Sequence, residues 1–187
     1  MGSARLFKCK NCDSPIPPEI SMKLKFNVCP ICGNLYPQTI EYIENYFRII
    51  QISNELDASK KLLIKSELNA SVREAIIKFE TIIRNKSGLI DNIGASLMAE
   101  AFNFKIDLKT KEFIEEPKIK LNELSNISMR NEQEGFKLMT MGFMQGIRNI
   151  YMHTEGADRL YYALQIITIV DLFLKQIGGT SIASCSK

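Results

Sequence analysis

The chain has 187 residues, of which 45% are apolar and 24% are charged, a mixture typical of a soluble globular protein. Its net charge of +3 is too small for the overall balance to indicate a nucleic-acid partner. The excess is confined to residues 1–38, with five basic and two acidic side chains, whereas residues 39–187 hold 19 of each. We find neither a signal peptide nor an uninterrupted apolar run of the ~18 residues that span a bilayer, so we expect a cytoplasmic protein without membrane contact.

Four cysteines form two pairs near the amino terminus, Cys9 with Cys12 and Cys29 with Cys32. Each pair presents two thiolates from one tight turn, and two such pairs complete the tetrahedral four-sulfur site that zinc prefers. The surrounding prolines leave little hydrophobic core, so a segment this small needs a metal to fold. Because cysteine fills all four positions, the predicted zinc is structural and not catalytic. Two disulfides are the competing interpretation, which a cytosolic chain disfavours.

We therefore predict a zinc ribbon over residues 1–38, a helical domain over residues 39–180 and a flexible tail over residues 181–187. The ribbon acts either as a docking or folding module or as a nucleic-acid contact through its five cations. These cations are Arg5, Lys8, Lys10, Lys23 and Lys25. The fifth cysteine, Cys185, falls in the polar tail, and we interpret it as an incidental free thiol.

After the ribbon, apolar residues recur with a period near 3.6, which predicts helices. The first helix is expected over residues 38–55. The next runs to residue 85, with Asp57 or Ser59 as its cap and Gly88 as a left-handed residue at its end. A shorter helix is expected over residues 90–102. The charged stretch that follows, up to residue 126, predicts a loop or short strands.

Two more helices are predicted over residues 132–152 and 157–176. The methionines of the first indicate core packing, and its three glycines permit the close approach of another helix, within the chain or in a second copy. These glycines are Gly135, Gly142 and Gly146. Long amphipathic helices with short connections predict a mostly α fold, an antiparallel helical bundle.

The chain contains a single histidine, His153, which follows Arg148 and Asn149 in the run RNIYMH. Histidine is the side chain whose ordinary pKa allows proton transfer near neutral pH, and arginine is a permanent cation that forks onto phosphate oxygens. These residue types suit phosphodiester cleavage without a catalytic metal. The alternative interpretation is structural: the histidine favours a helix C-terminus, and the arginine is solvated or paired with an acid.

Helix geometry limits how the motif can work. Residues five apart on a straight helix lie about 140° apart around its axis, so Arg148 and His153 do not share a face. Asn149 and His153, four residues apart, do share one. Arg148 and His153 therefore converge only if the helix ends or loosens near residues 151–153, or if the two side chains come from two chains.

The motif resembles the Arg-x4–6-His motif of HEPN-domain ribonucleases, and residues 97–174 resemble the Ymh-like branch of that superfamily. In that branch a Leu-Met and Ala-Phe segment, here at residues 97–102, precedes the pattern Gly-x-Arg-Asn-Pro-x-x-His. This chain has Ile150 in place of the proline and Met152 where a small residue often precedes the histidine. The resemblance implies a HEPN-like helical bundle in which two subunits pair and their motifs share one cleft.

The resemblance further implies a metal-independent endoribonuclease that acts as a toxin or an antiviral-defence effector. His153 would be the general base on a ribose 2′-hydroxyl or the general acid for the leaving 5′-oxygen. Arg148 would hold the phosphate, and Asn149 would orient His153 or bind a phosphate oxygen. The products would be a 2′,3′-cyclic phosphate and a 5′-hydroxyl. The expected partners are RNA, a second copy of the chain, and an antitoxin or effector protein.

Two other functions stay open. One is a non-catalytic HEPN module that binds nucleotide or RNA and docks a partner through the zinc ribbon. The other is a regulator that reads DNA through the ribbon, which is disfavoured because no helix is rich in Arg, Lys, Asn and Gln. Exposure of Arg148 and His153 in a shared cleft would favour the nuclease, and burial of His153 would favour the binding module.

Overall fold

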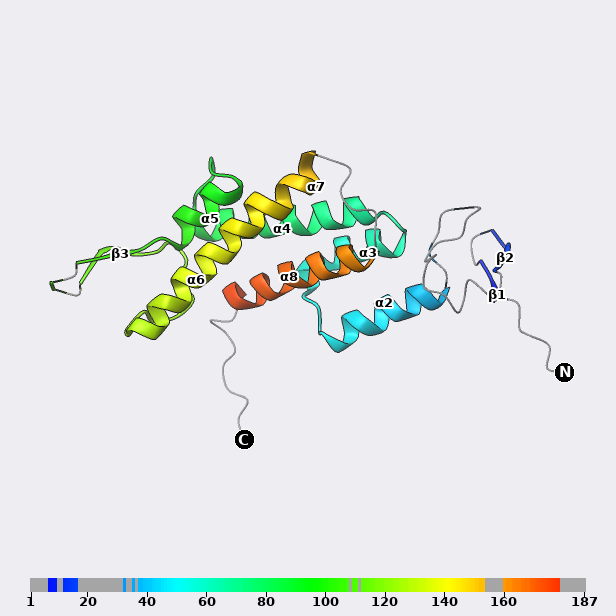
Figure 1. Cartoon of the computed structure of the whole chain (residues 1–187), viewed down its shortest axis with the longest axis horizontal. Coiled ribbons are helices and arrows are strands. Elements are labelled where there is room, and N and C mark those ends of the chain that lie inside the picture. The colour runs from blue at the N-terminus through cyan, green and yellow to red at the C-terminus, as the bar shows by residue number, and fades with distance from the viewer. Residues whose placement is uncertain are drawn as a thin grey trace, which may run out of the picture.

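The computed structural model describes residues 7–9, 12–16, 32, 35, 37–107, 109–110, 112–153 and 160–178. Over these residues the chain is mostly helical, as predicted, with two small antiparallel strand pairs (Figure 1). Strand β1 (Phe7–Lys8) pairs with β2 (Pro15–Ile16) beside the first cysteines. Strand β3 (Lys105–Ile106) pairs with β4 (Phe113–Glu115) in the stretch where short strands were expected.

Helix α2 (Pro37–Ile49) is shorter than the predicted helix over residues 38–55. The backbone leaves the helical conformation at Gln51, which has a φ of 50°. The Ser53 hydroxyl then accepts a hydrogen bond from the Glu55 amide and caps a separate 3-10 turn, η1 (Asn54–Leu56). The prediction was too long because apolar periodicity continues across this break.

The predicted long second helix is in fact two helices, α3 (Asp57–Ile64) and α4 (Leu68–Ser87). The turn between them passes through Ser66, whose φ is 68°. Neither predicted cap acts as one. Asp57 is the first residue of α3, and Ser59 lies inside it, where its hydroxyl donates to the Ser71 carbonyl at 2.7 Å.

Helix α4 ends as predicted, with Gly88 in the left-handed region at a φ of 74°. Helix α5 (Gly94–Phe102) follows. Helix α6 (Ile127–Phe143) begins five residues earlier than the predicted helix, because the Asn126 side chain accepts a hydrogen bond from the Met129 amide and caps it.

Helix α6 continues without a break into a π-helical turn, η2 (Met144–Arg148), and then into α7 (Asn149–His153). Helix α8 (Leu160–Gly178) closes the fold. The predicted start of the last helix at residue 157 lies outside the described residues. By length and composition α8 alone among the described helices is apolar enough to span a membrane, but 56% of its most apolar stretch is buried inside the protein.

The core forms where α4, α6 and α8 meet. The ring of Phe173 on α8 lies 5.5 Å from Phe79 on α4, and 5.6 and 5.4 Å from Phe136 and Phe143 on α6. These three contacts tie the helix that carries the Arg-His motif to the two central helices, α4 and α8 (Figure 1). Aromatic pairs in such tilted and edge-on arrangements contribute about 0.5–1.5 kcal/mol each beyond the area they bury.

The outer face of α6 and η2 differs from the prediction. Apart from their chain neighbours and the backbone of their own helix, no heavy atom of the described chain lies within 4 Å of a Cβ built at Gly135, Gly142 or Gly146, so no other described helix packs against these glycines. Met144 is buried as expected, but the side chain of Met139 is 57% exposed. This face is therefore open and partly apolar.

Gln133 supports a stability prediction, because its fully buried amide satisfies three backbone groups. It donates to the carbonyls of Phe102 and Ile119 at 3.1 and 2.8 Å, and it accepts from the Leu121 amide at 3.0 Å. We expect Gln133→Leu to lower the free energy of unfolding by about 2–4 kcal/mol, because these groups stay buried without partners. Urea denaturation followed by circular dichroism measures this change. Gln145→Leu, at an exposed position of η2, is the control, and an equal loss in both variants would contradict the assignment.

Candidate functional site

The amino-terminal cysteines gather at one point. The Sγ atoms of Cys9, Cys12 and Cys32 lie within 4.8 Å of one another, and those of Cys9 and Cys32 are 3.4 Å apart. Cys9 follows β1, and Cys12 lies in the turn between β1 and β2. Cys29, the fourth predicted ligand, lies outside the described residues.

The local backbone and hydrogen bonds favour the thiolate form. Asp13, with a φ of 56°, reverses the chain so that the Cys9 amide donates to the Ser14 carbonyl at 2.9 Å. The hydrogen bond of the Cys12 sulfur with the Ser14 hydroxyl, at 3.1 Å, lowers the pKa of Cys12 to about 6. Zinc binds thiolate sulfurs in a tetrahedron at about 2.3 Å, so the three clustered cysteines can hold a metal such as zinc.

The cysteine cluster is tied to the helical bundle through Leu35. This residue lies three positions after Cys32, is only 3% exposed, and belongs to the main hydrophobic core. Helix α2 starts two residues later and packs against α8, where the Tyr46 and Thr168 hydroxyls are 2.8 Å apart. Metal binding would therefore stabilise the start of α2 as well as the segment before it.

Arg148, the first residue of the Arg-His motif, points toward α4. Its Nη2 atom lies 3.7 Å from Oε2 of Glu80, and only 17% of the Arg148 side chain is exposed. At this distance the two groups form an ion pair but not a hydrogen bond. The Arg148 Nε atom is buried and has no hydrogen-bond partner among the described residues. The guanidinium is thus balanced in charge, while part of its capacity to donate hydrogen bonds is unused.

Glu80 is the site residue that sequence reasoning missed. Its side chain is 6% exposed, and its Oε1 atom accepts a hydrogen bond of 2.5 Å from the Gly94 amide, at the first residue of α5. The helix N-terminus adds a favourable positive potential to this hydrogen bond. The signal in the sequence was a lone carboxylate on the apolar stripe of α4, where Ile76 and Ile83 are also buried.

A second residue of α4 holds the far end of the motif. The Arg73 guanidinium donates a hydrogen bond from Nε to the backbone carbonyl of Tyr151, which lies in α7. Arg73 and Glu80 are seven residues apart and so project from the same face of α4. Helix α4 therefore contacts the motif both at Arg148 and at the last turn before His153.

Among the described side chains of the motif, the structure places Arg148 and Asn149 on different sides of the helix. Asn149 lies on the exposed side of the helix, where its Nδ2 atom donates to the Gln145 carbonyl at 2.9 Å. His153 is the last residue of α7, and its side chain lies outside the described part of the structure. The helix loosens over the π-helical turn that ends at Arg148, and α7 ends at His153, within the stretch where an ending was predicted.

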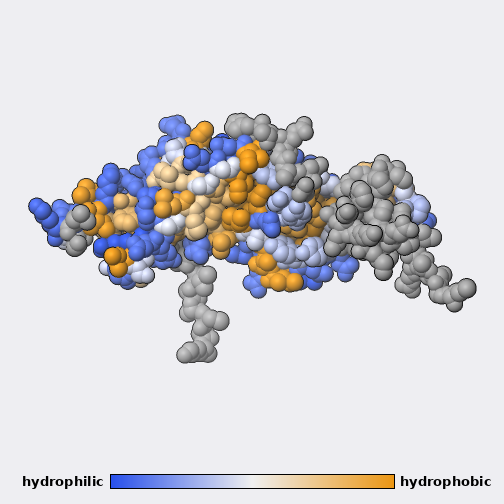
Figure 2. Space-filling view, viewed as in Figure 1, coloured by the Kyte–Doolittle hydropathy of each residue, from blue (hydrophilic) through white to orange (hydrophobic). Residues whose placement is uncertain are grey.

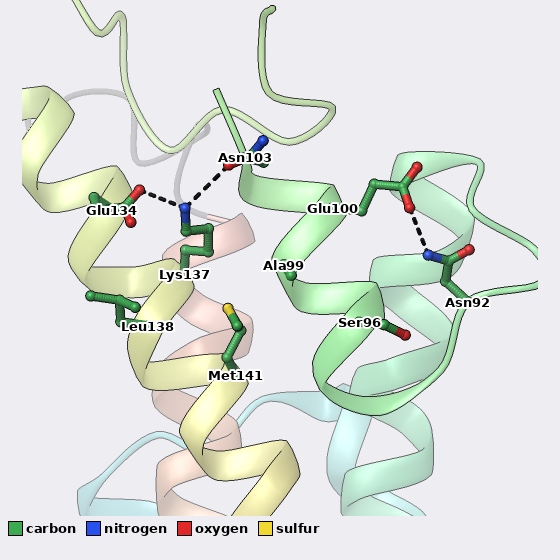
Figure 3. A pocket seen from close by; sticks show the side chains of 9 residues that line it. All are labelled: Asn92, Ser96, Ala99, Glu100, Asn103, Glu134, Lys137, Leu138 and Met141. Atoms are coloured by element: carbon green, nitrogen blue, oxygen red, sulfur yellow. Dashed lines mark hydrogen bonds and ion pairs between the residues drawn. The ribbon is translucent and has the colours of Figure 1, made fainter. Parts of the chain in front are cut away.

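A shallow groove of about 510 Å³ lies between α5 and α6 (Figure 3). On the α6 side the Lys137 ammonium lies 2.7 Å from Glu134 and 3.2 Å from Asn103. On the α5 side the Asn92 amide donates to Glu100 at 2.7 Å. The charged groups of the groove thus pair with each other or with neighbouring amides. No residue of the Arg-His motif lines the groove, so the motif is the stronger candidate site.

Comparison with known proteins gives one match. The family model described as "Protein of unknown function (Hypoth_ymh)" matches residues 55–177, which is more than half of the chain. The matched segment begins in η1, ends in α8, and includes Glu80 and the entire Arg-His motif but not the cysteines. No curated protein and no protein of solved structure matches the chain.

The cysteine cluster yields a prediction about metal content. We expect purified protein to carry about one zinc ion per chain, and Cys12→Ala to carry almost none, because a structural site loses affinity when a thiolate is removed. Elemental analysis measures both. Cys185→Ala is the control and should keep its zinc. Because Cys12 binds metal only as thiolate and its pKa is about 6, the affinity of the site for zinc should fall as the pH drops below that value. Full zinc content in Cys12→Ala would contradict the assignment.

Proposed function

The chain belongs to the Hypoth_Ymh family, and from this premise we propose that it is a metal-independent endoribonuclease of the HEPN type. The observation that carries the proposal is the state of Arg148. Its charge is balanced by Glu80 at 3.7 Å, but its Nε atom has no hydrogen-bond partner in the described part of the chain. The unused Nε–H is a donor from which an anion can accept a hydrogen bond once the atoms that cover it move aside.

The ligand that suits this arginine is a phosphate group. The Nε–H and one Nη–H of a guanidinium form a fork that matches two phosphate oxygens. Because the Arg148 side chain is largely removed from water, its interaction with the extra negative charge of a phosphorane is stronger than at an open surface. Arg148 therefore holds the scissile phosphate and stabilises the transition state.

The proton transfers fall to His153, because the chain contains no other histidine. His153 removes the proton of a ribose 2′-hydroxyl or protonates the leaving 5′-oxygen. Asn149, four residues earlier on the same face of α7, orients His153 or donates to a phosphate oxygen. The reaction leaves a 2′,3′-cyclic phosphate and a 5′-hydroxyl, and it needs no catalytic metal.

We infer that a second copy of the chain completes the site. Arg148 faces α4, whereas the outer face of α6 and α7 is open and carries exposed apolar side chains of Leu138, Met139 and Ile150. Figure 2 shows apolar surface in the middle of the molecule, where Figure 1 places α6 and α7. Contiguous apolar surface of this kind favours protein contact. A homodimer formed over this face brings the motif helices of the two chains together, with Asn149 of each chain at the interface.

The resemblance to HEPN ribonucleases supports a role as a cytoplasmic toxin or antiviral-defence effector. The cysteine cluster, with zinc bound, docks RNA, an antitoxin or another effector protein. The cluster precedes α2 and lies far from the motif helix in the sequence. Docking and cleavage are therefore assigned to separate parts of the chain.

The ion pair with Glu80 favours one other candidate, a non-catalytic HEPN module that binds RNA. An arginine kept in a buried pair can hold a phosphate without assisting any reaction. In that case the protein binds RNA through Arg148, and His153 is dispensable.

The direct test is incubation of wild-type and His153→Ala protein with total RNA in excess EDTA. We expect the wild type to cleave and to leave cyclic phosphate ends, and His153→Ala to be inactive with unchanged helical content, because the proton acceptor and donor is gone. Gel analysis and end-group chemistry measure the products. Cleavage by His153→Ala would refute the assignment, and RNA binding without cleavage by either protein would favour the binding module.

Mixing two inactive variants tests the shared site. In a mixture of Arg148→Ala and His153→Ala chains, each mixed dimer has one site with both residues if the site spans two chains. We expect about a quarter of wild-type cleavage after subunit exchange, because half of the dimers are mixed and each has one of its two sites intact. If subunit exchange is demonstrated but cleavage does not recover, each chain uses its own Arg148 and His153.

A further inference from the structure

We propose that Glu80 is the positioning residue that fixes the Arg148 guanidinium for phosphate, an inference that rests on the function proposed above. Glu80 lies in α4, more than sixty residues before the motif, and it touches no substrate. Its role is to act through Arg148. The proposal stands on three features of this part of the structure, namely the anchoring of the Glu80 carboxylate, the π-helical turn and the second contact at Arg73.

The carboxylate of Glu80 is itself held in place. Its Oε1 atom accepts a hydrogen bond of 2.5 Å from the Gly94 amide, and the Glu80 side chain is 6% exposed. The amide donor belongs to the first residue of α5, where the helix N-terminus favours a negative charge. Because these contacts fix the position of the carboxylate, Glu80 determines where the ion pair forms, and the Arg148 guanidinium orients toward it.

The second oxygen of Glu80 faces Arg148, with Oε2 3.7 Å from Nη2. The Nε edge of the guanidinium is left without a partner among the described residues. The ion pair therefore draws the guanidinium toward Glu80 and leaves the Nε–H unused, as a donor for a ligand once the atoms that cover it move aside. A bidentate pair between Glu80 and the Nε–Nη2 edge would have used that edge.

The backbone around Arg148 supports the same role. The π-helical turn η2 adds a residue to the turn that ends at Arg148, and such turns are frequent at functional sites. Arg73 holds the Tyr151 carbonyl one turn further along. Helix α4 thus fixes both the side chain of Arg148 and the backbone that leads to His153.

A positioning role and a binding role make opposite predictions. Glu80 is negative and so weakens the attraction of the site for phosphate. Removing its charge should leave RNA affinity equal or higher, while Arg148 loses its fixed direction and the reaction slows. A lower kcat with an unchanged or lower KM is therefore the expected signature, and loss of stability alone does not produce it.

The variant is Glu80→Gln, whose amide oxygen still accepts from the Gly94 amide. The control is Glu55→Gln, which removes a carboxylate from an exposed ion pair with Lys78, also on α4. We expect kcat on a fluorescent RNA to fall at least roughly tenfold in Glu80→Gln with KM no higher than in wild type, and both constants to stay unchanged in the control. If Glu80→Gln does not fold, Glu80→Asp takes its place. Its shorter side chain keeps the negative charge but moves it away from Arg148, so we expect the same fall in kcat.

A second readout does not depend on cleavage. The Nε–H resonance of Arg148, assigned by its loss in Arg148→Lys, is followed while a 2′-O-methyl RNA oligonucleotide is added. We expect the resonance to shift strongly in wild type and weakly in Glu80→Gln at equal RNA occupancy.

The two readouts separate the inference from the proposed function. Wild-type kcat in Glu80→Gln would overturn the inference and leave the nuclease intact, as would a fall in kcat that merely matches the fraction of unfolded protein. If wild type does not cleave RNA at all, the proposed function fails. The resonance then decides alone, and equal shifts in wild type and Glu80→Gln would overturn the role of Glu80.

Discussion

Three parts of the chain meet at the buried carboxylate of Glu80, namely α4, the start of α5 and the π-helical turn that ends at Arg148. Removing a carboxylate from water costs several kcal/mol unless partners compensate for it. Here the Gly94 amide, the N-terminus of α5 and the Arg148 guanidinium supply that compensation. The aromatic contacts around Phe173 hold the same helices together from the apolar side. The arrangement of the motif is therefore inseparable from the packing of the bundle.

This arrangement divides the motif helix into two faces with different tasks. The inner face carries Arg148, which α4 orients. The outer face carries Asn149 and exposed apolar side chains, and no described part of the chain covers its glycines. A helix that is fixed on one side and open on the other is suited to contact a second molecule. In the proposed nuclease that molecule is another copy of the chain.

The sequence predicted those features that depend on periodicity and on local chemistry. The apolar repeats indicated a mostly helical fold, Gly88 marked the end of α4, and the spacing of Cys9, Cys12 and Cys32 indicated their cluster. It failed where a break leaves no compositional trace. The turns at Gln51 and Ser66 contain neither glycine nor proline, so the apolar stripe runs through them without a signal.

The candidate site was predicted only in part for a related reason. Arg148 and Asn149 could be singled out because their residue types suit phosphate chemistry. Glu80 was not singled out, although it lies on the apolar stripe of α4, because a charged residue in an amphipathic helix is usually solvated and its partner Gly94 lies in another helix. The π-helical turn also has no sequence pattern of its own, and it arises where α6 and α7 pack on α4 and α5. Long-range partners decide both features.

The most direct test of the central claim is a structure of the protein with a bound 2′-O-methyl RNA oligonucleotide, which resists cleavage. The account predicts a backbone phosphate within hydrogen-bond distance of the Arg148 Nε and Nη atoms, with the Glu80 pair retained and His153 near the 2′-oxygen. RNA bound elsewhere, with Arg148 still paired with Glu80 and no phosphate at Nε, would contradict it.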